Sequence, residues 1–176
     1  MKTFTTTYTS PLGPIVIESD GEAITSLRFC DEPENTVSTD QGVEVLKEAF
    51  PKEAATTPSI IAKTLRWLDD YFAGKRMENA TTGKKEGCRI AVRPKGTAFQ
   101  QRVWQALLTI PYGKTISYGE IAKMVDCRSA QAVGQAVGAN PIALLIPCHR
   151  VVGANGTLGG YAYGLNRKKQ LLELEK

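Results

Sequence analysis

The sequence predicts an α+β protein with a small antiparallel sheet and helices in its N-terminal half and a mostly helical C-terminal half. Three short runs rich in Thr, Ile, Val, Tyr and Phe, at residues 4–8, 14–19 and 24–29, predict the sheet, because β-branched and aromatic residues favour strands. Apolar residues at helical spacing after Gly96 predict the change to helices. At 176 residues the chain has room for one large domain or two small ones.

Turn-forming residues separate the three predicted strands. Ser10-Pro11-Leu12-Gly13 follows the first run and Asp20-Gly21 follows the second, so each pair of runs is expected to form a hairpin. The acidic and polar residues 31–40 predict a loop, and the pattern over residues 41–50 is compatible with a helix.

A clearer helix is predicted over residues 59–73, ended by Gly74. Its apolar stripe consists of Ile61, Leu65, Leu68 and Phe72. Core packing explains this stripe, so we assign it no chemistry. Residues 74–96 are rich in Gly, Lys, Glu and Thr and predict a linker in which only residues 88–92 are ordered. The domain boundary is therefore placed near Pro94, giving domains of residues 1–94 and 95–176.

Short helices make up most of the predicted second domain. The first has an apolar face formed by Phe99, Val103, Leu107 and Ile110. Pro111-Tyr112-Gly113 ends it. Ser117 then predicts a helix N-cap, and Glu120 three residues later completes a capping box. The helix that starts there carries Ile121, Ala122 and Val125 as its apolar residues.

A tight turn at residues 126–128 leads from this helix into another, over residues 129–138. Two short helices joined by a tight turn are the layout of a helix-turn-helix. The second helix is rich in small residues, which suit either close approach to DNA or plain helix packing. The glycines of residues 153–164, with Tyr161 and Tyr163, predict a pocket wall. A last helix over residues 165–175 is expected to direct Leu165, Leu171 and Leu172 inward.

Charge is divided unevenly between the two halves. Residues 1–94 carry 12 Lys and Arg against 14 Asp and Glu, whereas residues 95–176 carry 10 against 4. A basic surface favours a polyanionic partner, although many basic faces are merely solvated. No apolar run is long enough to span a bilayer, and the first residues lack a signal-peptide core, so we expect a cytoplasmic protein.

The four cysteines are scattered, without paired Cys-x-x-Cys spacing. We therefore expect neither disulfides nor a structural metal site. One of them, Cys148, is followed at once by His149, the only histidine in the chain. A thiol is a strong nucleophile only as thiolate, and a nearby base can generate it. Sequence neighbours rarely face each other, so His149 is expected to act through a bridging water or a backbone bend. The alternative is a buried structural cysteine beside a satisfied histidine.

The C-terminal half resembles the O6-alkylguanine-DNA alkyltransferases, also called methylated-DNA–protein-cysteine methyltransferases. The most specific match is Ile146-Pro147-Cys148-His149-Arg150-Val151. Further matches in the same order are residues 96–100, 103–104, 110–113, 115–122, 132–134, 140–141, 152, 156, 158, 160–161 and 171–175. The N-terminal half matches more loosely, through residues 10–13 and 71–76. The resemblance implies a ribonuclease H-like fold for that first domain.

The resemblance also implies a single-turnover repair protein that acts on double-stranded DNA containing O6-alkylguanine and needs no cofactor. A monomer is expected, since one lesion per molecule requires only one chain. Cys148 would take the alkyl group from a guanine flipped out of the duplex. His149 would deprotonate Cys148 through a water, and Glu175 would orient His149. Tyr118 would protonate the leaving guanine, and Asn140 would act as a structural hinge. O4-alkylthymine stays open as a second substrate.

The same resemblance implies where base and duplex would bind. The flipped base would be read by Val151, Gly160, Tyr161, Ala162 and Tyr163. The duplex would be contacted by Ser117, Tyr118, Arg128, Ala130, Gln131 and Gly134. Without the resemblance, Glu175 would be a solvated helix end, Tyr118 a core residue and Asn140 an ordinary turn residue before proline.

Three features depart from the family pattern. Gln131 stands where an arginine normally fills the gap left by the flipped base, which predicts weaker extrusion or weaker duplex affinity, with Arg128 a substitute. Tyr163 stands where glycine is usual, which predicts poor reaction with bulky benzyl adducts. Because the one histidine is committed to the active site, the N-terminal zinc of some relatives is not expected.

Two rival functions remain from the sequence. One is a non-catalytic alkyltransferase-like protein that binds alkylated bases and flags them for other repair; Gln131 fits it, whereas Cys148, His149 and Glu175 argue against it. The other is a cysteine hydrolase or thiol-redox protein. That chemistry needs an oxyanion site or a resolving cysteine, and the sequence near Cys148 offers neither.

Overall fold

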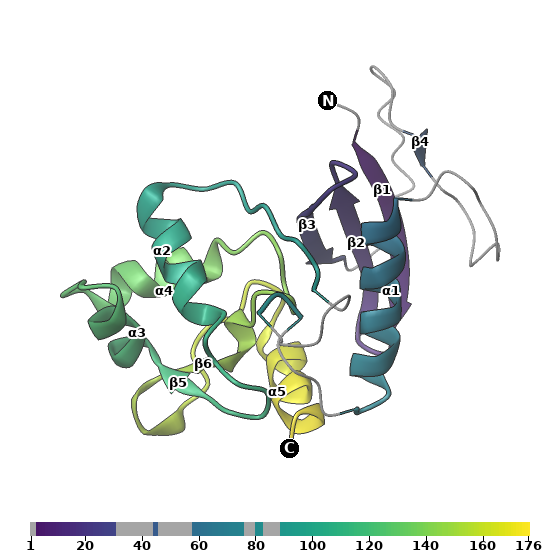
Figure 1. The fold of residues 1–176 in the computed structure, drawn as a ribbon. Coiled ribbons are helices and arrows are strands. Elements are labelled where there is room, and N and C mark those ends of the chain that lie inside the picture. The colour runs from purple at the N-terminus through teal and green to yellow at the C-terminus, as the bar shows by residue number, and fades with distance from the viewer. Residues whose placement is uncertain (1–2, 31–43, 46–57, 76–79, 83–88) are drawn as a thin grey trace.

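Three strands form the antiparallel sheet that the sequence predicted, in a computed structural model that describes residues 3–30, 44–45, 58–75, 80–82 and 89–176. They are β1 (Phe4–Ser10), β2 (Gly13–Ser19) and β3 (Ile24–Phe29). A parallel strand, β4 (Glu44–Val45), extends the sheet beside β1, giving the order β3-β2-β1-β4 (Figure 1).

The helix predicted over residues 41–50 is wrong at residues 44–45, which form the strand β4. Residues 44–45 are a strand because they pair with Phe4 and Thr5 of β1, and such non-local pairing overrides the local preference for a helix. The other residues of that predicted helix lie outside the described residues, as does the predicted loop at 31–40.

The turn between β1 and β2 is built by two of the predicted turn residues. The Ser10 hydroxyl donates to the Gly13 carbonyl over 2.6 Å and accepts from the Leu12 amide over 3.1 Å. Gly13 has φ +111°, a conformation that residues with a side chain rarely adopt. The turn therefore requires glycine at position 13.

One helix, α1 (Ser59–Phe72), covers a face of this sheet (Figure 1). Of the predicted apolar stripe, Ile61 and Leu68 are fully buried and Leu65 and Phe72 are partly buried. Tyr71 on the same helix is also fully buried. Gly74, with φ +71°, follows the end of the helix as predicted.

Backbone pairing along β3 joins the two halves of the chain. On one part of the strand, the Ile24 amide donates to Ala91 over 2.8 Å and the Arg93 amide donates to the Ile24 carbonyl over 2.8 Å. Further along, the Leu27 amide donates to Pro141 over 2.9 Å and the Ala143 amide donates to Leu27 over 2.8 Å. The sheet thus holds the segment that leads directly to Cys148.

The predicted helix-turn-helix is confirmed in the second half. α2 (Ala98–Leu107) precedes it, and α3 (Tyr118–Met124) and α4 (Ala130–Gly138) form it (Figure 1). The capping box of Ser117 and Glu120 is present, and Ser129 caps α4 by accepting from the Ala132 amide over 3.1 Å. Of all helices in the described part of the chain, none combines the length and apolar character needed to cross a bilayer.

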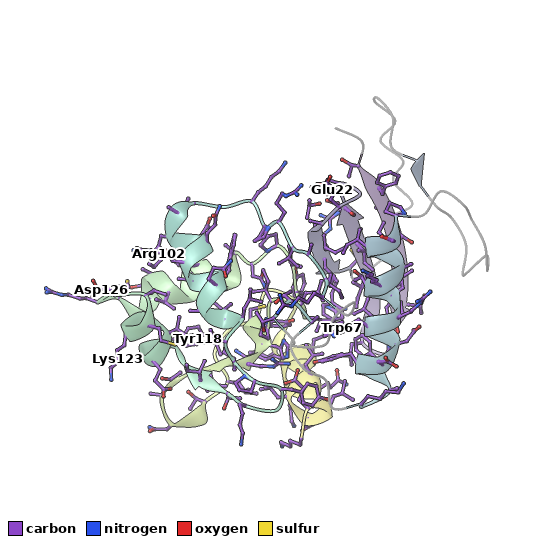
Figure 2. All side chains as sticks on the ribbon, in the orientation of Figure 1. Glu22, Trp67, Arg102, Tyr118, Lys123 and Asp126 are labelled. Carbon is purple, nitrogen blue, oxygen red and sulfur yellow. The ribbon has the colours of Figure 1, made fainter. Side chains whose placement is uncertain are left out.

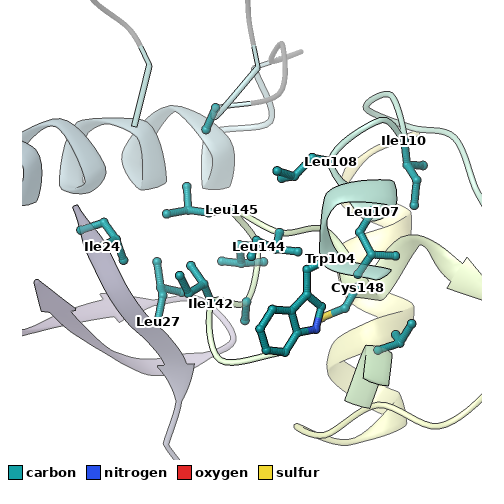
Figure 3. Close-up of a cluster of buried hydrophobic side chains, with 14 of the residues drawn as sticks. Ile24, Leu27, Trp104, Leu107, Leu108, Ile110, Ile142, Leu144, Leu145 and Cys148 are labelled. Carbon is teal, nitrogen blue, oxygen red and sulfur yellow. The ribbon is translucent and has the colours of Figure 1, made fainter. Parts of the chain in front are cut away.

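Buried apolar side chains from both halves share one core (Figure 3). Ile24 and Leu27 of the sheet meet Ile142, Leu144 and Leu145, all at most 2% exposed. In the same core, the buried indole Nε1 of Trp104 on α2 donates to the Ala136 carbonyl of α4 over 2.8 Å. This core fixes α2 and α4 relative to the segment that precedes Cys148.

The end of the chain forms η1 (Cys148–Arg150), β6 (Val151–Val152), η2 (Ala154–Gly156) and α5 (Leu165–Leu174), with β6 parallel to β5 (Ile116–Ser117). Leu171 on α5 is buried as predicted, but Leu165 is 49% exposed, so its predicted inward position is wrong. Leu165 lies on the first turn of α5, which borders an open pocket, and Lys168 takes the inward position one turn later.

Candidate active site

Cys148 sits on a tight turn at the end of a buried segment. The Cys148 amide donates to the Ile146 carbonyl over 2.8 Å, and the Arg150 amide donates to the Pro147 carbonyl over 3.1 Å. Cys148 itself is 5% exposed. Burial raises the pKa of its thiol above the ordinary 9.0, and the Asn140 amide and the Lys168 ammonium only partly oppose that effect. The resting residue is therefore a neutral thiol.

The Asn140 side chain holds this segment in shape. Its amide nitrogen donates to the carbonyls of Ile146, at 2.9 Å, and Ile142, at 3.3 Å, while its oxygen accepts from the Ile142 amide at 3.0 Å. All three contacts are buried, and a buried peptide group without a partner is costly. Asn140 thus links the end of α4 to the turn that carries Cys148.

His149 is fully buried and hydrogen-bonded to Glu175, with 2.8 Å between Nε2 and Oε1. Burial lowers the pKa of His149 below 6.5, against an opposite effect of Glu175. A neutral imidazole that donates from Nε2 has its basic lone pair on Nδ1. Nδ1 has no hydrogen-bond partner among the described residues, so it is the nitrogen available to take a proton.

The carboxylate of Glu175 accepts hydrogen bonds from three other residues besides His149. Arg150 donates from Nε over 2.8 Å and from Nη2 over 2.9 Å, the Tyr71 hydroxyl donates over 2.7 Å and the Gly113 amide over 3.1 Å. Burial would raise the pKa of Glu175, but the hydrogen bonds and charges of His149 and Arg150 hold it well below 4.5. Glu175 is thus a buried anion aimed at His149.

Sequence reasoning missed three of these partners. Arg150, Tyr71 and Gly113 were only parts of the matched segments, and none of them was assigned a role in the site. The signal at Gly113 is conformational: its φ is +70°, and a Cβ there would lie 2.6 Å from the Glu175 backbone oxygen. Tyr71 begins the family match at residues 71–76, but that match does not reveal its contact with Glu175, which spans 104 residues.

Tyr118 begins α3 and packs against the glycine-rich loop. Its hydroxyl donates to the Gly160 carbonyl over 3.4 Å, and a Cβ on Gly159 would lie 2.7 Å from its ring. Lys168, also missed from sequence, donates to the carbonyls of Gly159 and Gly160 at 3.1 and 3.3 Å. Its ammonium lies 5.9 Å from the Tyr118 ring centroid, which suits a cation–π contact. Burial raises the pKa of Tyr118, so its phenol is protonated.

The predicted base-reading residues lie in different environments. Val151 is fully buried and Ala162 is exposed. The rings of Tyr161 and Tyr163 meet edge to face at 5.4 Å, and Tyr163 meets Phe29 of β3 in the same way at 5.5 Å. Tyr163 therefore packs toward the sheet. The fifth of these residues, Gly160, is exposed and presents its carbonyl to Tyr118 and Lys168.

The predicted DNA-contacting residues divide into two groups. Arg128, Ala130 and Gln131 are exposed around the turn and the start of α4, at the end of the molecule where Figure 2 labels Lys123 and Asp126. Gly134, in contrast, lies beside Tyr118, since a Cβ added to this glycine would lie 3.8 Å from the tyrosine ring. Ser117 uses its hydroxyl within the capping box, donating to Glu120 over 2.7 Å.

Comparison with known proteins gives matches over both halves of the chain. Residues 98–176 match the family model described as the DNA-binding domain of 6-O-methylguanine DNA methyltransferase, and residues 3–81 match the model of its ribonuclease-like domain. A methylated-DNA–protein-cysteine methyltransferase of Mycobacterium leprae is 46% identical over 95% of this chain and 88% of that protein. One from Methanosarcina acetivorans is 41% identical over 96% of this chain and 95% of that protein.

A solved structure shares the fold over nearly the whole chain. The crystal structure of Mycobacterium tuberculosis OGT in complex with DNA is 40% identical, covers 98% of this chain and 92% of that one, and superposes with a TM-score of 0.78. The predicted α+β class, with its ribonuclease-like first domain, is therefore confirmed. The chain belongs to the 6-O-methylguanine DNA methyltransferase family.

Proposed function

We propose that this protein repairs alkylated DNA by moving the alkyl group from O6 of guanine to Cys148, once per molecule. A bond forms between Sγ and the alkyl carbon while the bond from that carbon to O6 breaks. The thiol proton passes to His149, and the electron pair of the broken bond stays on the guanine. One observation carries the proposal. His149, the residue directly after Cys148 in the chain, is buried and donates a hydrogen bond to Glu175.

The electrostatics support a proton transfer that accompanies reaction. At rest both groups are neutral, because burial raises the pKa of Cys148 and lowers that of His149. Moving the proton creates a thiolate and an imidazolium inside the protein, where an unpaired charge is costly. Glu175 is already ionised and bonded to His149, so it stabilises the imidazolium without rearrangement.

The other proposed roles follow the positions of the side chains. Tyr118, kept protonated by its raised pKa, is the donor to the departing guanine, and Asn140 keeps the cysteine turn in place. The turn between α3 and α4 presents Arg128 to a duplex and the start of α4 presents Gln131, and the base enters beside Val151, Tyr161 and Tyr163.

We divide these tasks between residues 1–94, a supporting domain, and residues 95–176, which bind DNA and accept the alkyl group. The two matched family models, over residues 3–81 and 98–176, support this division. Within this proposal the protein acts as a monomer, without a cofactor, in the cytoplasm. One alkyl group per molecule requires only one chain.

The alternative function is a non-catalytic binder that flags alkylated bases. It gains support only from Gln131, which offers a weaker wedge than arginine for an extruded base. A binder would have no use for a buried cysteine followed directly by a histidine that is hydrogen-bonded to a carboxylate, and relatives 46% and 41% identical carry the name of methyltransferases.

Intact-protein mass spectrometry tests the proposal. The protein is incubated with a duplex oligonucleotide containing one O6-methylguanine, and Cys148→Ala is the control. We expect a gain of one methylene mass on the peptide that holds Cys148, with none in the control. Tight binding of the duplex without a mass gain would establish the flagging function instead.

A further inference from the structure

Arg167 connects the pocket wall to the sheet. Arg167 lies on α5, one residue before Lys168. Its side chain donates from Nε to the Leu12 carbonyl over 2.8 Å and from Nη1 to the Tyr163 carbonyl over 3.1 Å. Its guanidinium carbon lies 5.4 Å from the ring centroid of Phe29. One side chain thus bridges the β1–β2 turn, the end of β3 and the loop that carries Tyr163.

The bridge fixes a segment that has little regular structure of its own. Between η2 and α5 the loop has no helix or strand. Two contacts hold Tyr163. Its ring packs against Phe29, and its carbonyl accepts a hydrogen bond from Arg167. The ring contact ties the loop directly to the N-terminal half of the chain, and Arg167 ties it there indirectly through its own hydrogen bond to Leu12.

The β1–β2 turn leaves room for this guanidinium. A Cβ on Gly13 would lie 3.0 Å from Arg167 Nη2, closer than ordinary van der Waals contact. Arg167 also lines an open pocket together with Leu12, Phe29 and Tyr163. The guanidinium therefore occupies a fitted position between two carbonyls and an aromatic ring.

We propose that Arg167 is a positioning residue that sets the substrate-size limit of the base pocket by holding Tyr163 against the sheet. The inference rests on the proposed alkyl transfer and deepens it. In the proposed function Tyr163 forms part of the wall of the base pocket, so its freedom to move would decide how large an alkyl group can lie beside Cys148. A planar fork that donates in two directions is required, and a lysine cannot supply it.

The test compares single-turnover rates of methyl and benzyl transfer from duplexes carrying O6-methylguanine or O6-benzylguanine. Arg167→Met frees Tyr163, and we expect it to raise the benzyl-to-methyl rate ratio by about tenfold, since ångström-scale displacements near a reacting centre change rates by one to two orders of magnitude. Arg167→Lys, which keeps the charge and most of the stem, should raise the ratio too. Lys169→Met, which removes a charge from an exposed neighbour on the same helix, should leave the ratio unchanged.

A double variant separates positioning from general stability. In a Tyr163→Gly background, Arg167→Met should no longer change the ratio, because the side chain that it positions is gone. A ratio equal to wild type in both Arg167 variants would overturn the inference, even if their melting temperatures fell. Absence of methyl transfer by the wild-type protein would instead refute the proposed function, and the inference with it.

Discussion

The hydroxyl of Tyr71 donates a 2.7 Å hydrogen bond to the carboxylate of Glu175, across 104 residues of sequence. Tyr71 lies on α1, which covers the sheet, and Glu175 lies at the end of α5, directly after its last turn. Both side chains are buried. The helix of the N-terminal half therefore helps to orient the carboxylate that orients His149.

Tyr71→Phe should weaken both stability and reaction. It removes one buried donor from an ionised carboxylate and keeps the ring that packs on Trp67 and Phe72. We expect a loss of about 1–3 kcal/mol in the free energy of unfolding and a slower methyl transfer. Denaturant unfolding and single-turnover kinetics measure the two effects.

Tyr8→Phe is the matched control for Tyr71→Phe. Its hydroxyl donates to Asp69 over 3.0 Å at a site that is only partly buried. It should cost less stability and leave the transfer rate unchanged. Equal losses of stability and rate in the two variants would show that the Tyr71–Glu175 contact has no special role.

Acid should destabilise the protein in two steps. Burial lowers the pKa of His149 below its ordinary 6.5, so below pH 6.5 the unfolded chain binds a proton that the folded protein excludes. The pKa of Glu175 is held well below 4.5, so its stabilising contribution is lost as pH falls below 4.5. The free energy of unfolding is therefore highest above pH 6.5. It declines as pH falls below 6.5, and declines further as pH falls below 4.5.

Thermal unfolding as a function of pH measures these steps. The wild-type melting temperature should begin to fall below pH 6.5 and fall more steeply below pH 4.5. His149→Gln removes the first titrating group, so its melting temperature should stay constant between these two values. Parallel decline of the wild-type and variant curves from pH 6.5 downward would contradict this assignment to His149.

Asn140→Asp should destabilise the cysteine turn although the two side chains have nearly the same shape. The Asn140 amide nitrogen donates to Ile142 and Ile146, and a carboxylate oxygen there would face two carbonyl oxygens without a hydrogen to share. We expect a loss of at least about 2 kcal/mol, measured by denaturant unfolding. Asn166→Asp, at an exposed position on α5, is the control and should cost almost nothing; a similar loss there would refute the argument.

Gly159→Ala should displace Tyr118. A Cβ at this position would lie 2.7 Å from the Tyr118 ring, so the ring or the loop must move. We expect methyl transfer to slow by about tenfold or more, since small displacements of catalytic groups have effects of this size. Gly138→Ala, where nothing lies within 4 Å of the added carbon, should keep the wild-type rate. Unchanged kinetics in Gly159→Ala would argue against a role for Tyr118 in the reaction.

Gln131→Arg should strengthen DNA binding and speed repair. Gln131 is exposed on the first turn of α4, and an arginine there could both contact phosphate and fill the space left by an extruded base. Affinity for duplex DNA at several salt concentrations should show a salt slope steeper by about one. Gln135→Arg adds the same charge one turn later on α4 at another exposed position. If Gln135→Arg raised the repair rate as much as Gln131→Arg, the added positive charge alone would explain the effect, and filling the gap left by the extruded base would not be needed.

Local sequence patterns were enough to predict most of the helices and strands. The strands at the start of the chain and the capping box of Ser117 and Glu120 depend on residues close in sequence, and both are confirmed. The predicted helix over residues 41–50 was wrong at residues 44–45, because β4 exists only through pairing with β1. Leu165 was predicted to point inward but is 49% exposed, because an apolar residue on a predicted helix does not show which turn of that helix has a neighbour.

For the active site, the sequence by itself identified the residue types and their order. Cys148, His149 and Glu175 could be named from their match to a specific motif, and the structure places His149 and Glu175 in contact. The roles of Tyr71, Gly113, Lys168 and Arg167 were decided only by the tertiary structure. Each of them makes its contact across at least several residues and through burial that the whole fold creates. Hydrogen bonds and pKa shifts depend on distance and solvent exclusion, and these are properties of the packed molecule.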